Sequence, residues 1–125
     1  MDAFDLPSSG INKEVQTYLK SRTDLKGKRV FDCPAGDGRT SYRLKSLGAE
    51  VISGDLVPDY FKLKDHPCQE VNLNESLPFA DDHFDFIVSE EGIEHLQDQL
   101  SVLQEFARVL KPGGELLITT TSVSH

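Results

Sequence analysis

Several features that would place this sequence in a special class of proteins are missing. No apolar run approaches the ~20 residues that a membrane-spanning helix needs, and residues 1–10 lack the basic and apolar pattern of a signal peptide. There are only two cysteines, Cys33 and Cys68, and their separation is unlike that of metal ligands, so we expect free, buried thiols. These absences predict a cytoplasmic protein without a membrane partner.

Positive charge is also scarce. The 125 residues include 13 Lys and Arg against 21 Asp and Glu, which gives a formal net charge of −8. Nucleic-acid binding needs a basic face, so no nucleic-acid partner is expected. A cluster of basic residues between Lys20 and Arg29 is interrupted by Asp24, and we interpret it as a solvated surface at a helix end. With 38% hydrophobic and 27% charged residues, the composition is that of one globular domain with one core.

Short apolar runs alternate with helical patterns along the chain. The apolar runs predict strands at 28–33, 50–54, 68–73, 84–89 and 115–121. Between them we expect a first helix capped by Asn12, and further helices at 39–47, 58–63 and 98–110. Strands that alternate with helices pair in parallel, and right-handed crossovers then give an α/β fold: a doubly wound, Rossmann-like sheet with helices on both faces. The fifth strand would lie at an edge, so we expect the domain to be incomplete there.

The most informative segment is the turn between the first strand and its helix. The strand ends near Asp32, and the turn that follows contains Gly36 and Gly38. The next strand ends with Asp55, 17 residues beyond Gly38. A tight glycine turn lets the backbone approach a ligand closely, and an acid in that position can accept hydrogen bonds from a ribose diol. The two features predict a nucleoside-bearing cofactor at the carboxyl ends of parallel strands.

Residues 28–125 contain four sequence blocks in series: VFDCPAGDGRT, VISGDL, LPFADDHFDFIVSEEGIEHL and EFARVLKPGGELLITT. In this order and spacing they resemble the class I S-adenosylmethionine-dependent methyltransferases, particularly the small-molecule branch called type 11. The resemblance implies S-adenosylmethionine as cofactor and methyl transfer to a small-molecule acceptor. It divides the chain into an N-terminal lead-in and helix at 1–27 and a partial methyltransferase core at 28–125, because family members normally carry two further strands and a helix.

The resemblance also assigns cofactor-binding residues by position. It places the amino-acid end of the cofactor at Asp32, Pro34, Ala35, Gly36 and Gly38, the adenosine at Asp55, Leu56, Asn72 and Leu73, and the methionine portion above Ser89 and Glu90. Within this set, Asp55 would hold the ribose hydroxyls and Leu56 would pack against adenine. Pro34 replaces the usual first glycine of the family, and Asn72 replaces a frequent aspartate that meets the adenine amino group. Asn72 is also a good turn residue, so a purely local role for it stays open.

A Glu-x-x-Glu-His pattern follows the fourth predicted strand. On one helical turn, Glu91, Glu94 and His95 would share a face, where three such ligands can hold a divalent cation beside a substrate oxygen. The pattern resembles the metal-binding residues of some small-RNA and quinone-pathway methyltransferases, and His125 would come near the same cleft. The alternative is that Glu94 and His95 begin a surface helix, weakened by Gly92, that forms a wall of the pocket.

Two other functions stay open. A nicotinamide dinucleotide-binding domain would share the sheet, but it needs a Gly-x-Gly-x-x-Gly turn, and here Asp37 would repel a pyrophosphate. A non-catalytic module would keep the cofactor site and have its fifth-strand edge covered by another chain, for instance in a homodimer. Methyl transfer chiefly needs alignment of nucleophile, methyl group and sulfur, so the pattern names no catalytic residue.

Overall fold

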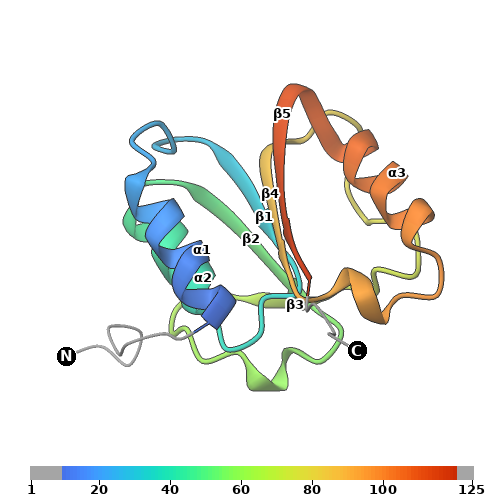
Figure 1. Cartoon of the computed structure of the whole chain (residues 1–125), viewed down its shortest axis with the longest axis horizontal. Coiled ribbons are helices and arrows are strands. Elements are labelled where there is room, and N and C mark those ends of the chain that lie inside the picture. Colours follow the sequence, from blue (N-terminus) through green and yellow to red (C-terminus); the bar gives the residue numbers. More distant parts are fainter. Residues whose placement is uncertain (1–9, 121–125) are drawn as a thin grey trace.

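The computed structural model describes residues 10–120, and its strands and helices follow the order that the sequence predicts (Figure 1). The helices are α1 (Gly10–Ser21), α2 (Arg39–Ser46) and α3 (Gln99–Val109), with two short 3₁₀ turns, η2 (Pro58–Tyr60) and η3 (Ile93–His95). The strands are β1 (Arg29–Asp32), β2 (Glu50–Asp55), β3 (Cys68–Glu70), β4 (Phe84–Glu90) and β5 (Leu110–Thr119). Between residues 10 and 120, no helix has the length and apolar character that crossing a membrane requires.

The strands form one sheet in the order β3-β2-β1-β4-β5, and each neighbouring pair in it is parallel. This arrangement confirms the predicted doubly wound, Rossmann-like sheet. The chain first builds outward from β1 to β3 and then returns to add β4 and β5 on the other side of β1. The carboxyl ends of β1 and β4 therefore lie at a topological switch point, where open α/β sheets bind their ligands. As predicted, β5 lies at an edge of the described sheet.

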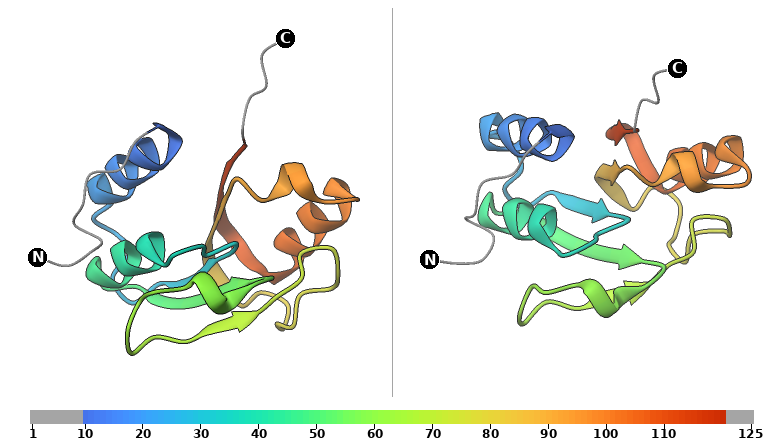
Figure 2. Two further views of the ribbon diagram at one scale, coloured as in Figure 1. Left: turned by 90° about the horizontal axis from the view of Figure 1, so that it is seen from below. Right: turned by 60° about the horizontal axis from the view of Figure 1, so that its bottom comes forward.

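Helices cover both faces of this sheet, and both views in Figure 2 show the same layers. α1 and α2 lie over one face, above a core cluster of Val15, Leu19, Leu25, Val30, Leu44, Phe86 and Val88. α3 lies over the other face, above a cluster of Phe31, Cys33, Val71, Leu73, Leu77, Phe84, Ile87, Ile93, Val102, Phe106 and Val109. Side chains alternate along a strand, so Val30 belongs to the first cluster and Phe31 to the second.

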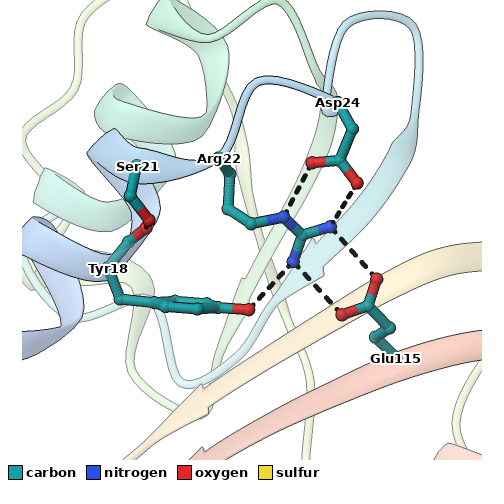
Figure 3. A network of polar contacts seen from close by, with 5 residues as sticks. All are labelled: Tyr18, Ser21, Arg22, Asp24 and Glu115. Atoms are coloured by element: carbon teal, nitrogen blue, oxygen red, sulfur yellow. Dashed lines mark hydrogen bonds and ion pairs between the residues drawn. The ribbon is translucent and has the colours of Figure 1, made fainter.

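A polar network around Arg22 fixes the carboxyl end of α1 to the sheet (Figure 3). The guanidinium group donates to both carboxylate oxygens of Asp24, at 2.7 and 2.8 Å, and to both of Glu115 in β5, at 3.1 and 3.2 Å. It also donates to the Tyr18 hydroxyl group at 3.1 Å and lies 5.1 Å from the centre of the Phe86 ring. The Arg22 side chain is only 13% exposed, so the expectation of a simply solvated basic segment is wrong at this residue.

Several element boundaries differ from the sequence prediction. α1 begins at Gly10, so Asn12 lies inside the helix and bonds to the sheet instead of capping the helix. The expected helix at 58–63 is a single 3₁₀ turn, because the Lys62 N–H group bonds to the Asp37 carbonyl group of the glycine turn. β5 extends back to Leu110, with an irregularity in its pairing with β4.

Candidate cofactor site

Most of the predicted cofactor residues lie where β1, β2 and β4 end, whereas Asn72 and Leu73 follow β3. Asp32 ends β1, Asp55 ends β2 and Glu90 ends β4. Parallel pairing brings these ends to one edge of the sheet, since Asp32 pairs with Ser53 in β2 and with Val88 in β4. The three carboxylates therefore flank the glycine turn at 34–38, which leaves the sheet at the end of β1.

The glycine turn is held against the end of β2. The Ala35 N–H group donates to the backbone carbonyl group just before Asp55 at 2.8 Å, and the Gly36 N–H group donates to Asp55 Oδ2 at 2.9 Å. Gly36 and Gly38 have φ angles of 54° and 97°, a left-handed conformation that glycine adopts without strain. A Cβ atom at Gly38 would also lie 3.0 Å from the Phe61 ring. Both conformation and space therefore require glycine at position 38.

Pro34 begins the glycine turn and packs against the loop after β4. A Cβ atom at Gly92 would lie 2.6 Å from Pro34 Cδ and 2.9 Å from its Cγ. The φ angle of Gly92 is −115°, which other residues adopt readily. The need for glycine therefore comes from the proline ring, and Gly92 makes room for the turn.

Two backbone amides bind the Asp55 carboxylate. Besides the Gly36 contact at Oδ2, the Val57 N–H group donates to Oδ1 at 3.0 Å. Each oxygen keeps a second acceptor position, so the carboxylate can accept hydroxyl groups while it fixes the turn. Leu56 and Val57 are 56% and 45% exposed, which gives the site an apolar surface beside Asp55.

Asp32 is a fully buried acid, only 1% exposed. Its Oδ2 accepts a 2.6 Å hydrogen bond from the Ser41 hydroxyl group of α2, whereas Oδ1 has no partner among residues 10–120. Burial raises the pKa of this carboxyl group to about 8; the Ser41 bond opposes the rise, and the nearby carboxylates Glu90 and Asp55 add to it. A buried oxygen without a donor costs free energy, and a cationic donor placed next to it would remove that cost.

A second polar network, which sequence reasoning missed, connects Glu90 to α1 and α2. Glu90 accepts hydrogen bonds from the Thr40 hydroxyl group at 2.7 Å and the Asn12 amide at 3.3 Å, and the Gln16 amide donates to Thr40 at 3.0 Å. Burial raises the pKa of Glu90, although both hydrogen bonds oppose this. Ser89, just before it, is 1% exposed, and its hydroxyl group has no partner within residues 10–120. The sequence signal for this network was the two polar residues at positions 12 and 16, which lie beside Val15 and Leu19, the buried apolar residues of α1.

The residues predicted near adenine lie in different surroundings. Asn72 Oδ1 accepts a hydrogen bond from the Asn74 N–H group at 2.9 Å, which is a local turn contact. Leu73 is 8% exposed and belongs to the core cluster under α3. Asn72 thus has the turn contact that the sequence left open, and Leu73 lies largely in the core.

The expected metal-binding turn does not form. Glu91 has a φ angle of 51°, and the helical turn after it is limited to η3. The predicted spacing gives a common face only when all of these residues are helical. In the part of the chain that the structure describes, no three His, Cys, Asp or Glu side chains come together as metal ligands, so Glu91, Glu94 and His95 do not fit a cation as they lie. His125 falls outside the described residues.

The fold is shared with solved structures. An S-adenosylmethionine-dependent methyltransferase from Mesorhizobium loti matches with a TM-score of 0.76 at 19% identity, covering 90% of this chain and 54% of that chain. The [4+2]-cyclase SpnF matches with a TM-score of 0.75 at 20% identity, covering 95% of this chain and 48% of that chain. At these identities the likeness shows the fold alone, and the second protein is named for a different reaction.

Sequence comparison identifies the family. The methyltransferase domain family matches residues 31–118. The chain is 32% identical over 128 aligned positions to the ubiquinone biosynthesis O-methyltransferase of Xanthomonas oryzae pv. oryzae, and the alignment covers 95% of this chain and 54% of the relative. The chain therefore spans about half the length of this curated relative. By the family match and the fold together, it belongs to the class I S-adenosylmethionine-dependent methyltransferases, as a methyltransferase domain of type 11.

Proposed function

We propose that this chain binds S-adenosylmethionine at the carboxyl ends of β1, β2 and β4 and transfers its methyl group to a small-molecule acceptor. The observation that carries the proposal is the unpartnered Oδ1 of Asp32, which is buried beside the glycine turn. The amino-acid end of the cofactor carries an ammonium group, which is the cationic donor that this oxygen lacks. The residues present therefore fit the cofactor that the family uses.

The other proposed contacts follow the family pattern: the amino-acid end at Asp32, Pro34, Ala35, Gly36 and Gly38, the ribose at Asp55, the adenine at Leu56, Asn72 and Leu73, and the methionine portion at Ser89 and Glu90. The spare acceptor positions of Asp55 support its role at the ribose. Asn72 Oδ1 likewise has a second acceptor position for the adenine amino group while it accepts from Asn74. The exposed side chain of Leu56 supports its place against the adenine ring.

When bound, the cofactor supplies a methyl group that is already activated on a sulfonium, so the task of the protein is alignment. The glycine turn is fixed by Asp55 on one side and by the contact of Pro34 with Gly92 on the other. α1 is held over the same end of the sheet by the bond from Asn12 to Glu90. A general base is needed only where the acceptor loses a proton, and we assign no residue to that role.

The Xanthomonas relative is named as an O-methyltransferase, and on that basis we propose an oxygen nucleophile on a small molecule. No step is assigned to a divalent cation, because Glu91, Glu94 and His95 do not gather as ligands. We place the reaction in the cytoplasm.

A second candidate function is a non-catalytic module that binds the cofactor and works with another chain. The observation that favours it is the edge position of β5, where Leu116 is 37% exposed. Pairing with a second copy along β5 would cover this edge. A methyl-transfer assay against a panel of hydroxylated metabolites separates the two candidates, since cofactor binding without transfer to any acceptor would support the module.

Isothermal titration calorimetry with S-adenosylhomocysteine tests the site itself. Asp55→Ala removes the carboxylate proposed to hold the ribose, so we expect affinity to fall about tenfold to a hundredfold, or roughly 1.5–3 kcal/mol. Asp59→Ala, which removes an exposed carboxylate in the following turn, is the matched control and should bind normally. Equal affinity in Asp55→Ala and wild type would overturn the ribose assignment, and binding of NAD in place of S-adenosylhomocysteine would overturn the function.

A further inference from the structure

A chain of hydrogen bonds leads from Asp32 to a histidine that no proposed cofactor contact uses. The Ser41 hydroxyl group bonds to Asp32 Oδ2 at 2.6 Å and to the Ser53 hydroxyl group at 2.5 Å. The Ser53 hydroxyl group in turn contacts His66 Nε2 at 2.9 Å. The four residues come from β1, α2, β2 and the segment before β3, so the fold is what connects them.

The two ends of this series of hydrogen bonds differ in their access to water. Asp32, Ser41 and Ser53 are 1%, 0% and 2% exposed. His66 is half-buried, and its ring centre lies 6.0 Å from that of Phe61. His66 is therefore the point at which the hydrogen-bonded chain reaches solvent.

We propose that Ser41, Ser53 and His66 position the Asp32 carboxyl group and conduct its proton to solvent when the ammonium group of the cofactor binds. This inference rests on the proposed function and adds how the buried acid becomes charged. A serine hydroxyl group has one hydrogen to donate, so the bonds along the chain run in one common direction. When Asp32 is ionised, Ser41 donates to Asp32, Ser53 donates to Ser41, and the His66 Nε2–H group donates to Ser53. When Asp32 is protonated on Oδ2, every bond is reversed and Nε2 is the final acceptor.

The proton transfer balances along this path. Asp32 gives the proton on Oδ2 to the Ser41 hydroxyl group, whose own proton passes to Ser53, and the Ser53 proton passes to His66 Nε2. His66 then releases its Nδ1 proton to water and stays neutral, as the other tautomer. One proton leaves the protein, one negative charge forms on Asp32, and the ammonium group of the cofactor compensates that charge.

The surroundings favour both end states. A proton on Asp32 Oδ1 would find no acceptor among residues 10–120, so Oδ2 is the favoured position. Burial, aided by the charge of Lys45, lowers the pKa of His66 and keeps the imidazole neutral near pH 7. The titratable groups that lie near the hydrogen-bonded path from Asp32 to His66 are Glu90 from β4, Asp55 from the end of β2, Lys45 from α2 and the free thiols Cys33 and Cys68. Burial raises the pKa of both thiols, so they stay neutral, and the two carboxylates oppose ionisation of Asp32 until a cation arrives.

NMR titration of the ligand-free protein tests the proton path between Asp32 and His66 without the cofactor. As the pH is raised, the ¹⁵Nε2 shift of His66 should change first when the ring loses its charge and then in a second step. The midpoint of this second step should equal the midpoint of the ¹³Cγ titration of Asp32, and Nε2 should gain its proton there. Ser53→Ala should abolish the second His66 step and move the Asp32 midpoint upward. Ser46→Ala, an exposed serine of α2, is the control and should change neither. If Ser53→Ala does not fold, His66→Gln should give the same upward shift for Asp32.

Three results decide the proposal. Unrelated midpoints in the wild-type chain, or a His66 step that persists in Ser53→Ala, would overturn the connection. S-adenosylhomocysteine added below the Asp32 midpoint should produce the same tautomer change at His66, and binding without that change would overturn the proton path while leaving the proposed function in place. Failure of S-adenosylhomocysteine to bind would overturn the proposed function, and the ligand-free titration would still decide whether Asp32 and His66 are connected.

Discussion

The buried carboxyl group of Asp32 should make cofactor binding depend on pH. Burial raises its pKa to about 8, so at lower pH most molecules hold a neutral acid that cannot pair with an ammonium group. The ionised fraction of an acid rises about tenfold per pH unit below its pKa. We therefore expect the affinity of the wild-type chain for S-adenosylhomocysteine to rise about tenfold per pH unit between roughly pH 5 and 7, and to level off near pH 8.

The same group affects the stability of the ligand-free protein in the opposite direction. An aspartate in the unfolded chain ionises near pH ~4, whereas Asp32 in the folded chain ionises near pH 8. Between these values the folded state holds a proton that the unfolded state has lost, so the contribution of Asp32 to stability is present below pH ~4 and is lost as the pH rises to about 8. Relative to Asp32→Asn, the wild-type chain should lose about 1.4 kcal/mol of unfolding free energy per pH unit in this window.

Calorimetry and urea unfolding at several pH values measure the two effects. Asp32→Asn should bind S-adenosylhomocysteine weakly and without the tenfold rise per pH unit, because the amide forms no ion pair. Asp82→Asn, at an exposed position in the turn before β4, is the matched control and should behave as wild type. A wild-type affinity that is constant from pH 5 to 7, or Asp32→Asn with wild-type affinity, would refute the role of Asp32 as the partner of a cation.

Three further predictions concern the scaffold. Gly92→Ala should lower the free energy of unfolding by about 1–3 kcal/mol, since the added Cβ atom would lie 2.6 Å from the Pro34 ring; an unchanged urea midpoint would show that the ring moves aside without cost. Glu115→Gln should cost less than about 1 kcal/mol in the same assay, because the Glu115 side chain that pairs with Arg22 is 54% exposed; a larger loss would mean that the network governs the docking of α1. Amides of β5 that point away from β4 should exchange quickly in a monomer and slowly in an edge-paired dimer, as followed by hydrogen-exchange mass spectrometry with sedimentation as the control for mass. Slow exchange at all of these amides in a monomer would contradict an open edge.

The sheet could be predicted because its signals are local in the sequence. A parallel strand buried on both faces is a short apolar run, as in β4, and glycine in the left-handed conformation marks the strand-to-helix turn, as at Gly36 and Gly38. Right-handed crossovers then limit the strand order. These rules bring Asp32, Asp55 and Glu90 to one end of the sheet without knowledge of any side-chain contact, and the structure places them there.

The contacts inside the site could not be predicted in the same way, because they join distant residues. Asn12 and Glu90 are 78 residues apart, and they meet only because α1 packs on the sheet face to which Phe86 and Val88 of β4 contribute. The buried chain from Asp32 to His66 likewise depends on how α2 lies over β1 and β2. At Glu91 the helical spacing suggested a metal-binding face, but the backbone there is left-handed and the helix begins later. Tertiary packing decided these points.

A crystal structure of the chain with S-adenosylhomocysteine tests the central claim most directly. We predict that the amino nitrogen of the ligand lies within hydrogen-bond distance of Asp32 Oδ1, that the ribose hydroxyls contact Asp55, and that the adenine lies against Leu56. A ligand bound elsewhere, or one that leaves Asp32 Oδ1 without a donor, would contradict it.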